Sequence, residues 1–148
     1  MNKLNWCKDK KNGIKIIEES KNLAKSYMNK SENSLKTMNR TPSDDWKIVT
    51  AYYTCYQVLY ALLQRVGIKS EIHDCTIELM SFFDFSEDDI EFIKKLKKKR
   101  IDAQYYVTKK VELEDEDRVK NFRLKCKELF EKSNFKEIRR KIISKLQS

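Results

Sequence analysis

The chain has 148 residues, and its 32 basic and 23 acidic side chains give a formal net charge of +9. This length and the 40% apolar content are typical of one domain with one modest core, which we expect to span residues 1–148. No apolar run approaches the roughly 20 residues that a membrane-spanning helix needs, and the polar N-terminus lacks the apolar stretch of a signal peptide. We therefore expect a cytoplasmic protein with no membrane contact.

Glycine and proline are nearly absent from the chain. Only Gly13, Gly67 and Pro42 occur, where average usage would give roughly 15 to 20 such residues. Tight turns between strands need residues that accept a positive φ, so the composition predicts an all-α fold. It also excludes the glycine-rich phosphate loops of dinucleotide-binding and P-loop proteins, because those loops need several glycines close together.

Apolar residues recur at intervals of three and four along most of the chain, which indicates amphipathic helices. A first long helix is expected from Gly13 to Asn39. Thr41 followed by Pro42 is typical of an N-cap and a first helical position, and the second helix that begins there should end at Gly67 in a left-handed C-cap. This second helix is apolar over most of its girth, so we expect it to form the centre of the core. Only the first dozen residues and the last few are expected to be loose.

Further helices are predicted in the second half of the chain. Ser70 predicts the start of a short third helix, and Ser86 with the three acidic residues after it predicts a fourth helix that fades at residues 107–108. A fifth helix begins in the acidic run 112–117 and is expected to break at residues 133–134 before it resumes. The simplest assembly is an up-and-down antiparallel bundle of four long helices plus a short one.

The four cysteines are Cys7, Cys55, Cys75 and Cys126, and His73 is the single histidine. No Cys-x-x-Cys pair is present, although zinc sites normally take two ligands from one short loop. We therefore expect no metal and no cofactor. In a cytoplasmic chain such cysteines are expected to be small hydrophobic residues of the core.

Charge is segregated along the sequence. Residues 71–93 contain eight acidic and no basic side chains, whereas residues 94–110 contain eight basic and one acidic side chain, a local charge of +7. Complementarity to the dipole of the fourth helix together with solubility is one explanation. An anion-binding patch, such as a nucleic-acid footprint, is the other.

Candidate binding residues lie within this basic stretch. Arg100 and Gln104 are four residues apart and share a helix face, and Tyr105 can project near them. A guanidinium group matches phosphate geometry and a tyrosine ring offers a stacking face, so these three residues, with Lys97 and Lys98, are candidate contacts for a nucleotide or RNA. In the alternative, Tyr105 lies in the core and Arg100 pairs with an acidic residue.

His73 is the one side chain whose ordinary pKa suits acid–base chemistry near neutral pH. It is therefore the candidate catalytic residue, together with Arg100. The alternative is a capping or packing histidine at the start of the third helix.

Three segments in this order resemble the HEPN superfamily of small prokaryotic helical domains: residues 50–63 (TAYYTCYQVLYALL), 67–73 (GIKSEIH) and 99–105 (KRIDAQY). The resemblance covers about residues 41–107. It implies an up-and-down helical bundle, often a homodimer, frequently encoded beside a minimal nucleotidyltransferase in toxin and antitoxin pairs. Many members are metal-independent endoribonucleases whose site combines an Arg, four to six spacer residues and a His across the dimer.

In this chain the positions that would hold that histidine are Tyr105, Tyr106 and Val107, and His73 lies upstream. A tyrosine with a pKa near 10 moves protons poorly at neutral pH. The favoured interpretation is thus a protein that binds a nucleotide or RNA without strong catalysis, in a toxin-antitoxin or defence module with a nucleotidyltransferase partner. The alternatives are a metal-independent endoribonuclease that uses Arg100 and His73, and a pure protein-interaction subunit.

Overall fold

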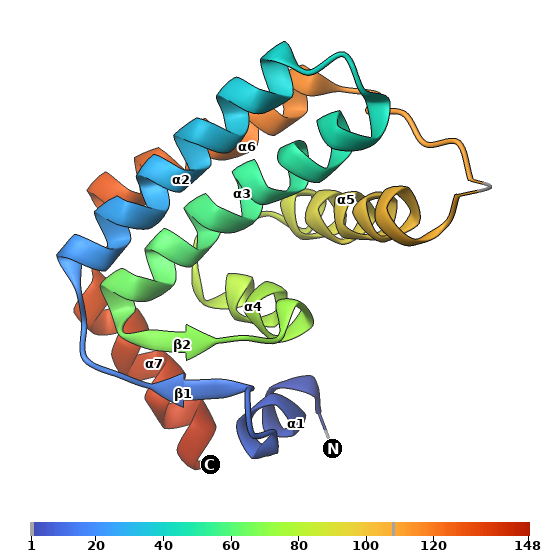
Figure 1. Ribbon diagram of the computed structural model, residues 1–148. Helices are drawn as coiled ribbons and strands as arrows, with labels where there is room; N and C mark the ends of the chain where they lie inside the picture. Colours follow the sequence, from blue (N-terminus) through green and yellow to red (C-terminus); the bar gives the residue numbers. More distant parts are fainter. Residues whose placement is uncertain (1, 108) are drawn as a thin grey trace.

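The computed structural model describes residues 2–107 and 109–148 and is mostly helical, as the composition predicts (Figure 1). In chain order the elements are α1 Lys3–Asp9, β1 Ile14–Ile16, α2 Lys21–Arg40, α3 Asp44–Val66, β2 Ile68–Ser70, α4 His73–Glu78, the 3-10 turn η1 Leu79–Phe82, α5 Glu87–Tyr105, α6 Glu116–Lys132 and α7 Phe135–Gln147. Within this described part of the chain, no helix combines the length and the apolar character needed to cross a bilayer.

Helix α3 is the centre of the core, as its all-round apolar sequence predicts. It packs against α2, α5 and α6, and α2 runs antiparallel beside it (Figure 1). The helix begins after Ser43, whose side chain accepts a hydrogen bond from the backbone N–H of Trp46, and not at Pro42 as predicted. It ends where expected, because Gly67 adopts the left-handed conformation with φ 72°.

The prediction of one helix from Gly13 to Asn39 is wrong at its N-terminal end. Residues 14–16 form β1, which pairs antiparallel with β2 so that Ile14 lies opposite Ser70. Helix α2 starts only after Ser20, whose side chain caps it. The apolar residues at the start of this segment alternate as well as repeat at helical spacing, and the pairing with a distant strand decides between the two.

The sequence predicts the start of the fourth helix correctly, but it predicts the start of the short third helix too early. Ser70 belongs to β2, and α4 begins at His73 without a side-chain cap. By contrast, α5 begins after Ser86 as predicted, and Ser86 and Asp89 form a reciprocal capping box there. Helix α5 ends at Tyr105, two residues before the predicted end; of that predicted end, Thr108 lies outside the described residues.

The C-terminal helices are positioned by caps and by buried charged groups. The predicted break at residues 133–134 is confirmed, with Asn134 capping α7. Asp89, only 3% exposed, pairs with Arg118 and Lys125 of α6 and so holds α5 against it. Arg139 of α7 donates to the backbone oxygens of residues 17, 66 and 67, which joins α7 to the end of the small sheet where β1 ends and β2 begins.

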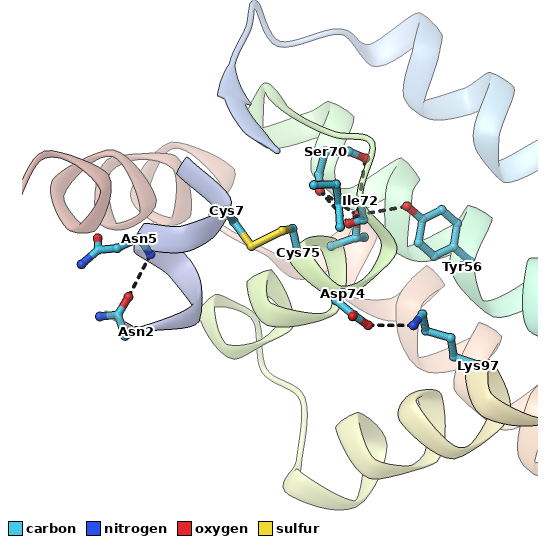
Figure 2. The surroundings of a disulfide bond; sticks show 10 residues. Asn2, Asn5, Cys7, Tyr56, Ser70, Ile72, Asp74, Cys75 and Lys97 are labelled. Carbon is cyan, nitrogen blue, oxygen red and sulfur yellow. Dashed lines mark hydrogen bonds and ion pairs between the residues drawn. A yellow bond between two sulfur atoms is a disulfide. The ribbon is translucent and has the colours of Figure 1, made fainter. Parts of the chain in front are cut away.

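The prediction that the cysteines are small hydrophobic residues of the core holds for two of them and is wrong for the other two. Cys55 and Cys126 are buried free thiols of the core, but Cys7 and Cys75 form a disulfide across 68 residues of sequence (Figure 2). The bond ties α1 to α4, so residues 2–12 are ordered where loose chain was expected. Because stable disulfides are typical of oxidising compartments, this one does not support the cytoplasmic expectation.

Candidate functional site

The single histidine lies against the aromatic face of α3. His73, the first residue of α4, places Nδ1 2.8 Å from the hydroxyl of Tyr52. Its ring also stacks on Tyr56, with centroids 4.1 Å apart and an interplanar angle of 12°. The tyrosines at positions 52 and 56 are one helical turn apart, so both reach the same side of α3.

A buried polar network holds α4 at this place. The Tyr56 hydroxyl and Oγ1 of Thr76 lie 3.0 Å apart, and Thr76 donates to Oγ of Ser70. Ser70 in turn donates its backbone N–H to the hydroxyl of Tyr60. Figure 2 shows the part of this network between Tyr56 and Ser70, beside the disulfide that fixes α4 from its other side. The orientation of His73 is therefore set by β2, α3 and α1 together.

Arg100 of α5 reaches the same tyrosine as His73. Its guanidinium carbon lies 5.0 Å from the ring centroid of Tyr52 and 5.8 Å from that of Tyr53. Nη1 donates to Oε1 of Gln104, while the buried Nε atom has no hydrogen-bond partner. Among residues 2–107 and 109–148, no carboxylate forms an ion pair with Arg100. The alternative in which Arg100 is neutralised by an acidic side chain is thus wrong for the described residues.

We call Tyr52, Tyr53, Tyr56, His73 and Arg100 the Arg100 cluster. Burial lowers the pKa of His73 from 6.5 to about 4, and the positive charges of Arg100 and Lys97 add to this effect, whereas Asp74 opposes it. Burial also raises the pKa of the Tyr52 and Tyr56 phenols far above their ordinary value. At neutral pH the imidazole and both phenols are therefore uncharged, and Arg100 carries the positive charge of the cluster.

The other predicted binding residues do not all join this cluster. Gln104 is held by Arg100, but Lys97 forms a 2.8 Å ion pair with Asp74 that links α5 to α4 (Figure 2). Lys98 is exposed on the opposite side of α5, where it lines a groove. Tyr105 is 69% exposed at the end of α5, so it does not lie in the core.

The groove beside Lys98 has a volume of about 1060 Å³. It lies between α5 and the segment that leads to α6. Its lysines are partly neutralised, since Lys99 pairs with Glu114 and Lys109 pairs with Asp102. The local charge of +7 in the sequence is therefore much weaker as a surface feature, and the groove is a mixed-charge surface.

A smaller cavity of about 300 Å³ adjoins the Arg100 cluster. Its aromatic walls come from α2, α3 and α4, and they are formed by Tyr27, Tyr53, Tyr56, Tyr60 and His73. We call it the tyrosine cavity. Sequence reasoning placed Tyr53, Tyr56 and Tyr60 on the apolar stripe of the second helix and Tyr27 on that of the first. The spacing of three and four residues within the second helix indicates a shared face, but it does not indicate that part of the face is open.

The described residues contain no group of three or more histidine, cysteine or acidic side chains placed to hold a metal ion. The functional groups of the Arg100 cluster are aromatic rings, one neutral imidazole and one guanidinium. Comparisons of the chain with protein-family models, with curated proteins and with solved structures found no match.

Proposed function

We propose that the chain is a HEPN-like helical protein that binds a nucleotide or RNA at the Arg100 cluster and does not cleave it efficiently. The proposed partners are a second copy of the chain and a minimal nucleotidyltransferase in a toxin-antitoxin or defence module, and they follow from the sequence resemblance. The packing of α3 against α2, α5 and α6 supports the up-and-down helical bundle that this resemblance implies, which we propose contains the four long helices and a short one predicted from the helical periodicity.

One observation carries the binding proposal: Arg100, which no described carboxylate neutralises, lies on the same tyrosine as the single histidine. A partly buried guanidinium that no described carboxylate neutralises is suited to a phosphate, because charge-assisted hydrogen bonds are about twice as strong as neutral ones. The Tyr53 ring beside it offers a stacking face. Both features point to a ligand that combines a phosphate with a flat ring.

Binding is favoured over cleavage by the state of His73. With a pKa of about 4, its imidazole is neutral at pH 7 and cannot supply the proton that a leaving oxygen needs. If the Tyr52 hydroxyl donates to Nδ1, the second ring nitrogen carries the proton and is a further N–H donor for a phosphate. This tautomer complements Arg100 in anion binding.

The opposite tautomer supports the second candidate, a metal-independent endoribonuclease. If Nδ1–H donates to the Tyr52 oxygen, the other ring nitrogen is free to accept the proton of a 2′-hydroxyl. The convergence of His73 and Arg100 on Tyr52 is the specific observation in favour. Incubation of RNA with the purified protein, with and without a chelator, tests it. Intact RNA refutes cleavage, and cleavage lost in both Arg100→Ala and His73→Asn supports it.

The binding proposal is tested by fluorescence anisotropy with a labelled single-stranded RNA of mixed sequence. Loss of hydrogen bonds to a charged group costs about 1.5–3 kcal/mol, so Arg100→Ala should weaken binding about 10- to 100-fold. The slope of log K against log salt concentration should also fall by about 0.7, the value for one phosphate contact on a single strand.

The matched control is Arg40→Ala, which removes the same charge from an exposed position at the end of α2. We expect it to change the affinity less than threefold. Equal losses in Arg40→Ala and Arg100→Ala would indicate diffuse charge attraction and contradict a site at the Arg100 cluster.

A further inference from the structure

The tyrosine cavity is built differently from an ordinary gap in a core. Tyr56 and Tyr60 line it from α3 and are almost fully buried, whereas Tyr27 and Tyr53 are only partly buried and keep accessible ring surface. The Tyr27 and Tyr60 rings meet edge to face at 4.8 Å. The result is a hollow with aromatic walls that solvent can reach from one side.

The part of the walls formed by Tyr56, Tyr60 and His73 is uncharged at neutral pH. Burial raises the pKa of the Tyr56 and Tyr60 phenols, and the His73 imidazole is neutral. Charged and amide groups occur among the lining residues too, namely Lys30, Gln57 and Glu71. A neutral aromatic interior with a few donors and acceptors around it is suited to a flat ring that carries polar edges.

The cavity and the Arg100 cluster share residues. Tyr53 and His73 line the cavity, and the Arg100 guanidinium lies 5.8 Å from the Tyr53 ring centroid. Arg100 does not line the cavity itself, but a ligand ring in the cavity would lie against a tyrosine and a histidine that also belong to the Arg100 cluster. In a nucleotide the atoms next to that ring are the ribose and the phosphate.

The volume limits what can enter. At about 300 Å³ the cavity lies at the lower end of the roughly 300–1,000 Å³ range of small-molecule sites. One base with its ribose is of suitable size. A base can stack on these rings only if its face is not already stacked within a duplex, so the base must be unpaired.

We propose that the tyrosine cavity is a base-binding subsite that takes one unpaired nucleobase, from a free nucleotide or from single-stranded RNA, while Arg100 holds the adjoining phosphate. This inference rests on the proposed function, because it places a base next to the phosphate contact proposed there. It adds that recognition depends on the base and not only on the charge of the backbone.

The test compares a short labelled single-stranded RNA with an abasic strand of the same length, which keeps the phosphates and lacks the bases. Stacking of a base on aromatic side chains is worth roughly 1–3 kcal/mol, so the wild-type protein should bind the RNA roughly 5- to 100-fold more tightly than the abasic strand. Tyr27→Leu should remove most of this preference and leave the affinity for the abasic strand unchanged. Tyr106→Leu, an exposed tyrosine outside the cavity, is the matched control and should keep the preference.

The outcomes separate the two proposals. If the wild-type protein binds both strands with equal affinity, the base-binding subsite is overturned while the phosphate site stands. This comparison uses only the wild-type protein, so it does not depend on the folding of a variant. If neither strand binds, the proposed function fails and the subsite fails with it. Arg100→Ala should weaken both strands by the same factor. Competition by millimolar adenosine or uridine monophosphate identifies a free nucleotide as a sufficient ligand, whereas competition only by the strand identifies single-stranded RNA, and either result supports the subsite.

Discussion

Protonation of His73 should destabilise the protein between pH 6.5 and pH 4. The charged groups that face its imidazole are Arg100 and Lys97 from α5 and Asp74 from its own helix, and the facing titratable side chains of α3 are Tyr52, Tyr53 and Tyr56. Two cations and the loss of water act against a positive imidazole, and one carboxylate favours it. The folded protein therefore resists a charge that the unfolded chain accepts readily.

The sign and size follow from the displaced pKa. The folded pKa, about 4, is below the ordinary value of 6.5, so the unfolded state binds more protons in this interval and stability falls as the pH falls. At 1.36 kcal/mol per pH unit the displacement corresponds to about 3 kcal/mol. Because His73 is only half-buried, we expect solvent screening to reduce the loss to about 2 kcal/mol.

The assay is urea unfolding followed by circular dichroism at a series of pH values from 7 to 4, for the wild type and for His73→Asn. Asparagine can retain the hydrogen bond to the Tyr52 hydroxyl but does not titrate. The wild type should lose about 2 kcal/mol more than the variant over this range, with most of the loss below pH 6. Carboxylates such as Asp89, whose pKa is lowered to about 2, titrate at lower pH in both proteins. Parallel stability curves would refute the reasoning.

Three further predictions concern the scaffold. Replacing both Cys7 and Cys75 by alanine, or reducing their bond, should lower the free energy of unfolding by about 4 kcal/mol because the bond closes a loop across 68 residues; reduction of the double variant should then change nothing. Asp89→Asn should cost about 3 kcal/mol in urea unfolding since it leaves two basic side chains without their buried carboxylate, while exposed Asp88→Asn should cost under about 0.5 kcal/mol. Gly67→Ala should lower the melting temperature by several degrees, because its φ of 72° and the arginine packed against it leave no room for Cβ; an unchanged melting temperature would contradict this.

Local sequence features determined most of the helical content. The sequence predicted the central helix, its C-cap at Gly67, the helix start at Ser86 and the break at residues 133–134. Each depends on residues within a few positions of one another, so the chemistry that decides it is visible in a short window.

Features that join distant segments were missed or misplaced. The strand at residues 14–16 exists because it pairs with residues 68–70, and the Cys7–Cys75 bond depends on α1, whose segment was expected to be loose. A stretch of three residues has no periodicity that separates strand from helix. Whether residues 14–16 form a strand depends on the pairing with residues 68–70, which lie more than fifty positions away.

The candidate site also combines features that the sequence predicts with features that only the tertiary structure determines. The sequence alone identified Arg100, Gln104 and His73 as residues with suitable chemistry and placed the first two on one helix face. It could not show that His73 meets Arg100 across Tyr52 or that Lys97 is occupied by Asp74. Side-chain type and spacing are local properties of the chain, whereas the pKa of a histidine and the pairing of a cation depend on which helices pack together, and only the tertiary structure decides that.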